Sequence, residues 1–310
     1  MNLIENVRRR ARLLDEIVAR LDRLQQAVGR LEARQLAAMD HDELHANEFQ
    51  VYSQWGEDGI LQHLIRRVPI ERRLFVEIGV ETYVEANTRF LAEHNNWAGL
   101  LLEADAAQVA AIRSNRIYWA ANLKAVTAFV TCENINDLLA EQGLKGDIGL
   151  LSIDVDGNDY WLWEAITAVN PRIVVCEYNS FLGSERPLVV PYAADFRRSL
   201  AHYSWLYYGA SLPALAYLAE RKGYHLAGTN SAGNNAFFVR RDVGQNVLER
   251  SVAESFTTAR FREAHDEAGN LTYPEYAEGQ ALIGDMPVWD VATGVIQPLR
   301  VALAGASGQA

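Results

Sequence analysis

Residues 74–105, LFVEIGVETYVEANTRFLAEHNNWAGLLLEAD, constrain the fold of this 310-residue chain more than any other stretch. Two apolar runs, Leu74–Val80 and Gly99–Leu102, are each too short for a buried helix and end on acidic or small residues. Between them, residues 85–95 carry helix formers, with apolar side chains at Phe90 and Leu91. The order is therefore strand, turn, helix and strand, the crossover that two parallel buried strands require. The stretch predicts an α/β fold built on a parallel sheet.

Acidic residues mark the ends of both predicted strands. Glu77 and Gly79 end the first strand, and Glu103 and Asp105 end the second. Ligands of open parallel sheets bind beyond the carboxyl ends of the strands, near the point where the strand order reverses. A carboxylate at the second strand end is the usual partner of a ribose diol, because it accepts both hydroxyl protons. We therefore expect a nucleoside-containing ligand at this edge.

The first turn argues against a dinucleotide. The pattern G-x-G-x-x-G is missing, since Gly79 is followed by valine and by Glu81, whose charge would oppose a pyrophosphate. An acidic turn suits a cation better, and S-adenosylmethionine carries a sulfonium as well as a ribose. S-adenosylmethionine is thus the candidate cofactor. The alternative is an ordinary strand–turn–helix whose acids only cap helices.

Composition narrows the classes of function and the compartment. The formal net charge is −11 and the pI about 5.2, which argues against non-specific nucleic-acid binding. The two cysteines, Cys132 and Cys176, lie in apolar runs, and no C-x-x-C suggests a thiolate zinc site. Neither a signal peptide nor an apolar run of about 18 residues occurs, so we expect a cytoplasmic protein without a transmembrane segment.

Residues 2–38 differ from the rest of the chain. Apolar residues recur at alternating spacings of three and four, no proline interrupts, and arginines alternate with acids. This pattern, about five heptads long, predicts a coiled coil and therefore a homo-oligomer. Two alternatives remain open: an amphipathic helix packed on its own domain, or a membrane-surface helix favoured by its arginines. The apolar stripe comprises Ile4, Val7, Ala11, Leu14, Val18, Leu21, Leu24, Val28 and Leu31.

Further segments extend the sheet. Residues 126–130, 147–155 and 173–177 read as strands separated by helices, and residues 224–228 and 236–240 as a final antiparallel pair. Upstream, SQWGED begins a helix, and we expect this turn to lie over the cofactor pocket, with capping alone as the alternative. The candidate cofactor contacts are Gln54, Glu57, Asp58, Glu77, Gly79, Glu103, Asp105 and Asp154.

A second acidic group follows the next two strands. Asp154 and Glu177 end neighbouring strands, and Asp156 lies just beyond the first, so like charges crowd one rim. They must separate, protonate or share a cation, and carboxylate oxygens suit Mg²⁺. Asp154, Asp156 and Glu177 are therefore the candidate metal ligands. Asp154, Asp156 and His202 are the candidate catalytic residues; His202 falls in an aromatic, proline-containing lid insertion at residues 180–210.

With these residues in place, the chain from about Phe49 to Asp242 resembles the class I methyltransferases, and most closely the FkbM-like and TylF-like branches. EIG at residues 77–79, LLEAD at 101–105 and SIDVDGNDYW at 152–161 carry the resemblance. It implies a doubly wound, seven-stranded, mostly parallel sheet and S-adenosylmethionine as cofactor. Glu77 and Gly79 would face the methionine part and Glu103 the ribose, and Asp154 and Asp156 match a strand end that holds Mg²⁺ in some TylF-like enzymes. The first turn departs from the pattern, with Glu81 and Thr82 where more glycines are usual.

These observations predict an oligomerisation helix at 1–38, a methyltransferase domain at 39–242 and a helical extension and tail at 243–310. The expected activity is O-methylation of a sugar, glycan or related small polyhydroxylated acceptor. One alternative is a coiled-coil scaffold with an inactive cofactor fold. The other is a nucleotide-sugar-modifying or oxidoreductase domain, whose glycine fingerprint is missing.

Overall fold

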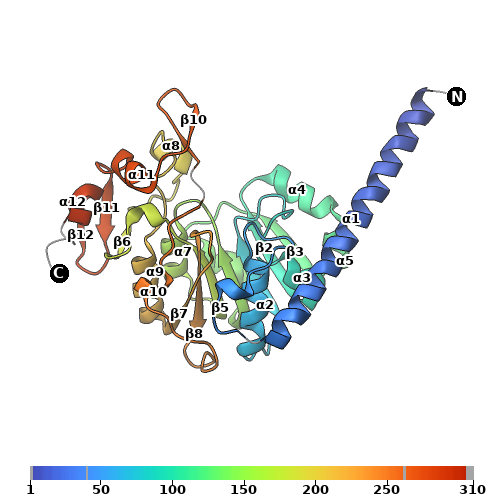
Figure 1. Ribbon diagram of the computed structural model, residues 1–310, viewed down its shortest axis with the longest axis horizontal. Helices are drawn as coiled ribbons and strands as arrows, with labels where there is room; N and C mark the ends of the chain where they lie inside the picture. The colour runs from blue at the N-terminus through green and yellow to red at the C-terminus, as the bar shows by residue number, and fades with distance from the viewer. Residues whose placement is uncertain (1–2, 40, 261–262, 305–310) are drawn as a thin grey trace.

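The computed structural model describes residues 3–39, 41–260 and 263–304, and its centre is a seven-stranded sheet of order β3-β2-β1-β4-β5-β8-β7 (Figure 1). β1 to β5 are parallel, whereas β8 runs antiparallel to both of its neighbours. The doubly wound, mostly parallel sheet is thus confirmed. Its strands are β1 Leu74–Ile78, β2 Ala98–Glu103, β3 Leu123–Thr127, β4 Gly146–Ile153, β5 Val169–Glu177, β7 Tyr224–Thr229 and β8 Asn235–Arg240.

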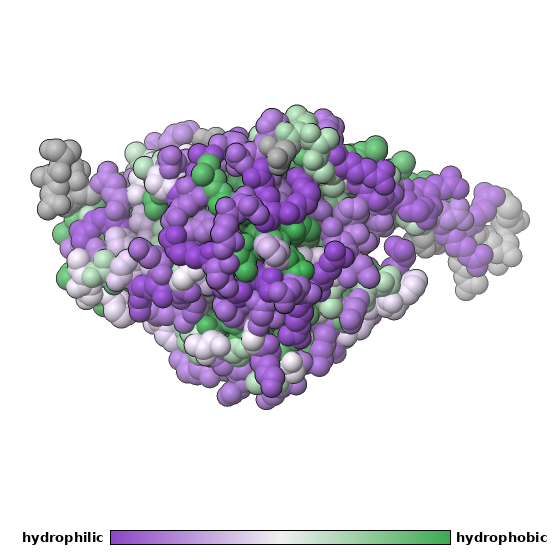
Figure 2. All heavy atoms as spheres, turned by 90° about the horizontal axis from the view of Figure 1, so that it is seen from below, coloured by the Kyte–Doolittle hydropathy of each residue, from purple (hydrophilic) through white to green (hydrophobic). Residues whose placement is uncertain are grey.

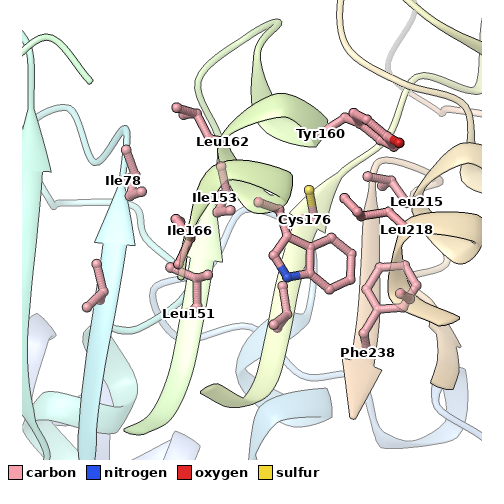
Figure 3. Packing of buried hydrophobic residues seen from close by; sticks show 14 of the residues in the cluster. Ile78, Leu151, Ile153, Tyr160, Leu162, Ile166, Cys176, Leu215, Leu218 and Phe238 are labelled. Atoms are coloured by element: carbon pink, nitrogen blue, oxygen red, sulfur yellow. The ribbon is translucent and has the colours of Figure 1, made fainter. Parts of the chain in front are cut away.

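Both faces of the sheet are covered by helices, which explains why its central strands β1, β2 and β4 are buried and largely apolar except at their ends. Alternate residues face opposite layers: Phe75 packs with the layer of α2 to α5, and Val76 with that of α6, α7 and α9. Figure 3 shows part of the second layer, where the helix residues Leu162 and Leu215 belong to the same apolar cluster as the sheet residue Leu151. These helices are α2 Glu57–Arg67, α3 Arg89–Asn95, α4 Ala106–Ser114, α5 Arg116–Ala120, α6 Ile135–Glu141, α7 Asp159–Ala165 and α9 Leu212–Lys222, with a short 3-10 turn η1 at His45–Asn47.

The N-terminal segment is one long helix, α1 Leu3–Met39, whose N-terminal part projects away from the domain (Figure 1). Its C-terminal part docks through Ala33 and Leu36 onto Phe49, Val51 and neighbouring aromatic rings. The other side is open to solvent, with Leu14, Leu21, Leu24 and Leu31 each about 60% exposed. The helix is as predicted, whereas the coiled coil stays a prediction.

The lid insertion and the segment after Asp242 build one body, here called the lid unit and comprising residues 180–210 and 264–304. Strand β6 pairs with β11, and β11 with β12, around a separate core that includes Leu188, Ile283 and Val288. The chain after Asp242 therefore holds more than the expected helix and tail. Its elements, with the connecting α10, are η2 Ser180–Leu182, β6 Leu188–Val189, α8 Arg198–Ala201, α10 Val252–Ser255, β9 Ala264–His265, β10 Leu271–Thr272, α11 Tyr276–Leu282, β11 Pro287–Asp290, β12 Val295–Pro298 and α12 Leu299–Ala304.

The face seen in Figure 2 is mostly hydrophilic, with apolar side chains scattered across it. Among the helices of the described residues, none combines the length and the apolar character that crossing a membrane requires.

Candidate active site

A cavity of about 510 Å³ lies beyond the carboxyl ends of β1, β2, β4 and β5. The strand order reverses there, because β1 pairs with β2 on one side and with β4 on the other. This is the place where open α/β sheets bind ligands. The wall combines the ends of these strands, the turn after β1, the β7–β8 turn and the lid unit; among its residues are Gln54, Glu77, Gly79, Asn87, Glu103, Asp154, Asp156, Glu177, Phe181, Phe196, Arg198, Tyr208 and Asn235.

Glu103 holds the inner side of the turn after β1. Its carboxylate accepts hydrogen bonds from the backbone N–H groups of Val80 (3.1 Å), Glu81 (2.8 Å) and Asp105 (2.9 Å). Each carboxylate oxygen offers about two acceptor sites, so capacity remains for hydroxyl donors in the cavity. The two hydroxyl groups of a ribose are donors of this kind.

Glu77 holds the far end of the same turn. It is buried and accepts hydrogen bonds from the N–H of Asn87 (2.9 Å) and from both the N–H and the hydroxyl of Thr88. Burial raises the pKa of Glu77 to about 7 in spite of these donors. The carboxyl group therefore organises residues 79–88 from below the cavity, and α3 begins only at Arg89 because the preceding residues form this turn.

The turn reaches its shape with a single glycine. Gly79 has a φ of +79°, and a Cβ there would lie 1.7 Å from the carbonyl oxygen of Asp154. Glu81 and Tyr83 also adopt positive φ values, +47° and +59°, which L-residues reach only at a cost. Arg89 supports them from outside by donating to the carbonyls of Tyr83 (3.3 Å) and Val84 (3.0 Å).

Three carboxyl groups converge at the ends of β4 and β5. One oxygen from each of Asp154, Asp159 and Glu177 lies within 4.8 Å of the others. Burial first, and then the neighbouring charges, raise the pKa of Asp154 and of Glu177 well above the ordinary range. Oε2 of Glu177 is buried and has no hydrogen-bond partner in the described part of the chain. The group can therefore hold a shared proton or a cation.

Asp159 takes the place in this group that the sequence predicted for Asp156. Asp159 joins the group while accepting from the N–H of Val155 (2.9 Å) and of Gly157 (3.0 Å), and burial raises its pKa to about 6. Asp156, at a φ of +55°, turns instead toward the lid unit and pairs with Arg198 at 2.8 Å. The predicted set of Asp154, Asp156 and Glu177 is thus not brought together as such, because Arg198 engages Asp156.

Other predicted contacts lie behind or outside the cavity wall. Glu57 accepts from the side-chain amides of Asn230 and Asn235, and Asp58 accepts the N–H groups of residues 51–53. Asp105 is exposed and caps α4 by accepting from the N–H of Ala107 at 2.7 Å. His202 lies outside the wall, and its Nδ1 shares a hydrogen bond with the hydroxyl of Ser204 at 2.8 Å. Of the SQWGED turn, Gln54 alone reaches the wall.

The lid unit contributes cavity residues that no sequence motif marks. Phe181, Phe196 and Tyr208 line the cavity, and the guanidinium of Arg198 lies 4.5 Å from the centre of the Tyr208 ring. The available signal was the density of aromatic residues and arginines at 180–210. That signal does not separate Tyr208, on the wall, from Tyr207, which is buried in the lid unit's own core.

A doubly wound sheet that ends in an antiparallel pair, with a carboxylate at the end of β2 and a cavity at the strand switch, is the architecture of the class I S-adenosylmethionine-dependent methyltransferases. The chain belongs to the FkbM methyltransferase family: the sequence model of the methyltransferase FkbM domain matches residues 45–224, more than half of the chain. No curated protein matches the chain by sequence.

Three solved structures show a distant likeness to this chain. The N-terminal domain of EvdMO1 with S-adenosylhomocysteine bound is 13% identical, with a TM-score of 0.34, over 54% of this chain and 72% of that one. An O-methyltransferase from Bacillus cereus in complex with S-adenosylhomocysteine is 14% identical, with a TM-score of 0.32, over 54% and 72%. The pyocyanin biosynthetic protein PhzM is 10% identical, with a TM-score of 0.34, over 58% and 56%. The assignment therefore rests on the family match.

Proposed function

We propose that this methyltransferase methylates a hydroxyl group of a sugar, glycan or related polyhydroxylated small molecule. One observation carries the proposal: the carboxyl groups of Asp154 and Glu177 share a cavity wall with the rings of Phe181, Phe196 and Tyr208. Flat rings can pack against the C–H face of a sugar, and carboxyl groups accept hydrogen bonds from its hydroxyls.

The acidic wall also bears on the charge of the acceptor. Arg198 is the single basic side chain among the described residues that line the cavity, and it is already paired with Asp156. A phosphorylated or carboxylated acceptor would meet uncompensated negative charge there. The wall therefore favours a neutral or cationic acceptor and disfavours a nucleotide sugar.

In the proposed mechanism, S-adenosylmethionine supplies an electrophilic methyl group. A sugar hydroxyl is a weak nucleophile at neutral pH, so its proton must leave as the new O–CH₃ bond forms and the sulfur–CH₃ bond breaks. The Asp154–Glu177 pair takes this proton, with the unpartnered Oε2 of Glu177 as the accepting atom. Glu103 would hold the cofactor ribose, and the lid unit would exclude water and align the acceptor.

A divalent cation such as Mg²⁺ is the alternative occupant of the acidic group. Asp154, Asp159 and Glu177 offer the hard oxygen donors that Mg²⁺ prefers, and the unpartnered oxygen of Glu177 leaves one donor uncommitted. When bound there, the cation would lower the pKa of a coordinated hydroxyl. The two versions place the acceptor hydroxyl at the same carboxyl groups.

Activity and binding assays test this proposal. We expect the wild type to transfer a methyl group to neutral polyols. Glu177→Gln should reduce the rate of this transfer by about 100-fold or more, as for loss of a general base, and should leave the affinity for S-adenosylhomocysteine unchanged. Glu141→Gln, an exposed residue remote from the cavity, is the matched control. Full activity of Glu177→Gln would refute the assignment of this carboxyl group. Exhaustive treatment with EDTA separates the carboxylate-base mechanism from the metal-assisted one, because only the carboxylate base remains active in chelator. Calorimetric titration of Mg²⁺ gives a readout independent of activity.

We also retain the proposal that α1 associates with a second copy of the chain. The exposed residues Leu14, Ile17, Leu21, Leu24, Val28 and Leu31 alternate at spacings of three and four, whereas Ala33 and Leu36 dock on the domain. The docked and exposed residues lie on different faces, so intramolecular packing leaves the stripe uncovered.

Residues 1–38, 39–242 and 243–310 remain the proposed division of the chain. The free thiols of Cys132 and Cys176 support a reducing, cytoplasmic location.

A further inference from the structure

The outer side of the cofactor turn, residues 79–88, is supported by Arg89. This side chain is 9% exposed, and its guanidinium donates to the carbonyls of Tyr83 and Val84. Because Tyr83 holds a positive φ, its conformation persists only while surrounding contacts enforce it. The same turn directs the N–H groups of Val80 and Glu81 at Glu103, so its shape sets the geometry of the proposed ribose acceptor.

Arg89 is itself held from the side remote from the cavity. Its Nε donates to Glu93 at 3.1 Å, and the guanidinium lies 4.1 Å from the centre of the Tyr52 ring. The carbonyl of Tyr52 also accepts from the N–H of Ala86 at 2.9 Å, and Ala86 lines the cavity. Tyr52 and Glu93 therefore hold the outer support of the turn in place.

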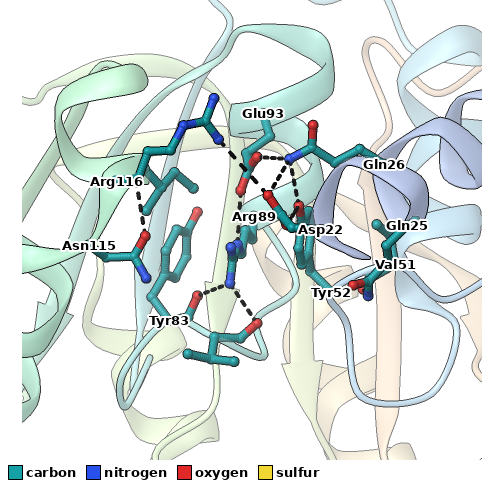
Figure 4. A network of polar contacts seen from close by, with 12 residues as sticks. Asp22, Gln25, Gln26, Val51, Tyr52, Tyr83, Arg89, Glu93, Asn115 and Arg116 are labelled. Atoms are coloured by element: carbon teal, nitrogen blue, oxygen red, sulfur yellow. Dashed lines mark hydrogen bonds and ion pairs between the residues drawn. The ribbon is translucent and has the colours of Figure 1, made fainter. Parts of the chain in front are cut away.

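The partners of Tyr52 and Glu93 come from α1 (Figure 4). The side-chain amide of Gln26 donates to the hydroxyl of Tyr52 at 2.9 Å and to the carboxylate of Glu93. The hydroxyl of Tyr52 in turn donates to Asp22 at 2.9 Å. An unbroken chain of polar contacts thus runs from α1 to the cofactor turn. The family match begins at residue 45, so α1 lies outside it.

We propose that α1 is a positioning element of the cofactor site, with Gln26 as the residue that couples the helix to the turn. Without its amide, Tyr52 and Glu93 lose a shared donor at the place where they hold Arg89. The buried guanidinium of Arg89 has little water nearby to replace these contacts. Its N–H groups therefore shift relative to the carbonyls of Tyr83 and Val84, which they bind. The N–H groups that orient Glu103 then lose their alignment. This inference concerns cofactor affinity and does not depend on which acceptor is methylated.

Substitutions in the full-length protein test the coupling. Gln26→Ala and Tyr52→Phe, which keeps the ring beneath Arg89, should each raise the Kd for S-adenosylhomocysteine and the KM for S-adenosylmethionine by about 5- to 10-fold, the lower end of typical coupling between sites. The kcat at saturating cofactor should stay unchanged, because none of the described residues of α1 lines the cavity. Hydrogen exchange should speed up at residues 79–88, which shows the turn directly.

Gln35→Ala is the matched control, since Gln35 is an exposed glutamine of the same helix whose amide contacts Met39 alone among the described residues. It should leave Kd, KM and exchange at residues 79–88 as in the wild type. Unchanged cofactor affinity in both Gln26→Ala and Tyr52→Phe would overturn the proposal. So would a fall in thermal stability with no change in exchange at the turn, because α1 would then stabilise the fold without positioning the site. Failure of the acceptor proposal would leave the Kd for S-adenosylhomocysteine and the exchange at residues 79–88 as readouts, because neither requires an acceptor.

Discussion

Replacing Glu103 by glutamine isolates the role of its charge, because the two side chains have the same shape. The carboxylate accepts three backbone N–H groups, whereas glutamine offers one acceptor oxygen and an NH₂ that can only donate. If the amide oxygen keeps the hydrogen bonds from Val80 and Glu81, the NH₂ group faces the N–H of Asp105. Both of these groups are donors, so no hydrogen bond forms between them. One hydrogen bond is therefore lost, and so is the charged acceptor for the ribose.

Hydrogen bonds to charged groups contribute ~1.5–3 kcal/mol each. The free energy of unfolding should fall by about this amount for the lost N–H partner. Binding of S-adenosylhomocysteine should weaken by a similar amount, which corresponds to a Kd increase of about 10- to 150-fold, since each 1.4 kcal/mol is tenfold.

Urea denaturation and isothermal titration calorimetry measure the two effects separately. Asp105→Asn provides the contrast: it weakens the exposed cap of α4, so we expect a stability loss of about 1 kcal/mol or less and an unchanged Kd. A Kd for Glu103→Gln within twofold of the wild type would refute the assignment of this carboxylate to the ribose.

Three further expectations concern association, stability and the lid. Leu24→Glu, on the exposed stripe of α1, should lower the mass found by light scattering, whereas Leu200→Glu, on an exposed leucine of the lid unit, should not. Equal masses in the wild type and both variants would contradict association through α1. Burial raises the folded-state pKa of Glu77 to about 7, so the folded protein binds its proton more tightly than the unfolded chain. Stability should therefore be highest below the ordinary glutamate pKa and fall as pH rises to about 7, by up to ~1.4 kcal/mol per pH unit, and denaturation of Glu77→Gln should show a shallower slope. Gly157→Ala would place a Cβ 2.2 Å from the ring of Phe196, which must then move. The KM for the acceptor should rise about tenfold or more, while S-adenosylhomocysteine binds as before. An unchanged KM would show that Phe196 does not contact the acceptor.

The central sheet is predictable because its signal is local. Each buried strand is a short apolar run, and β1 and β4 lie within about two residues of where those runs predict them, whereas β5 begins at Val169, four residues before the predicted start. β3 begins at Leu123, three residues before the predicted start, because this edge strand alternates between buried and exposed residues. The strands of the lid unit were not anticipated, since β6 has two residues and its partner β11 lies about 100 residues further along the chain.

The site was predictable at strand ends and less so beyond them. Glu77, Glu103, Asp154 and Glu177 reach the cavity because a residue that ends a parallel strand has its place set by the sheet. Asp156 and Asp159 could not be placed this way. The backbone turns to a positive φ at Asp156, and that reversal decides which of the two acids faces Glu177.

The construction of the lid unit bears on how acceptor specificity can change among related enzymes. β6 is hydrogen-bonded to β11, and the buried carboxylate of Asp290 pairs with Arg186, so the two pieces of the lid share one core and one ion pair. Phe181, on the cavity wall, packs against Tyr276 with ring centres 5.7 Å apart. A chimera that grafts only residues 180–210 from a relative would therefore inherit half of an interface. To change acceptor preference, residues 180–210 and 264–304 must be exchanged together. Recombination at a single crossover after Asp242 would separate the two segments, so we expect related enzymes to inherit them as a pair.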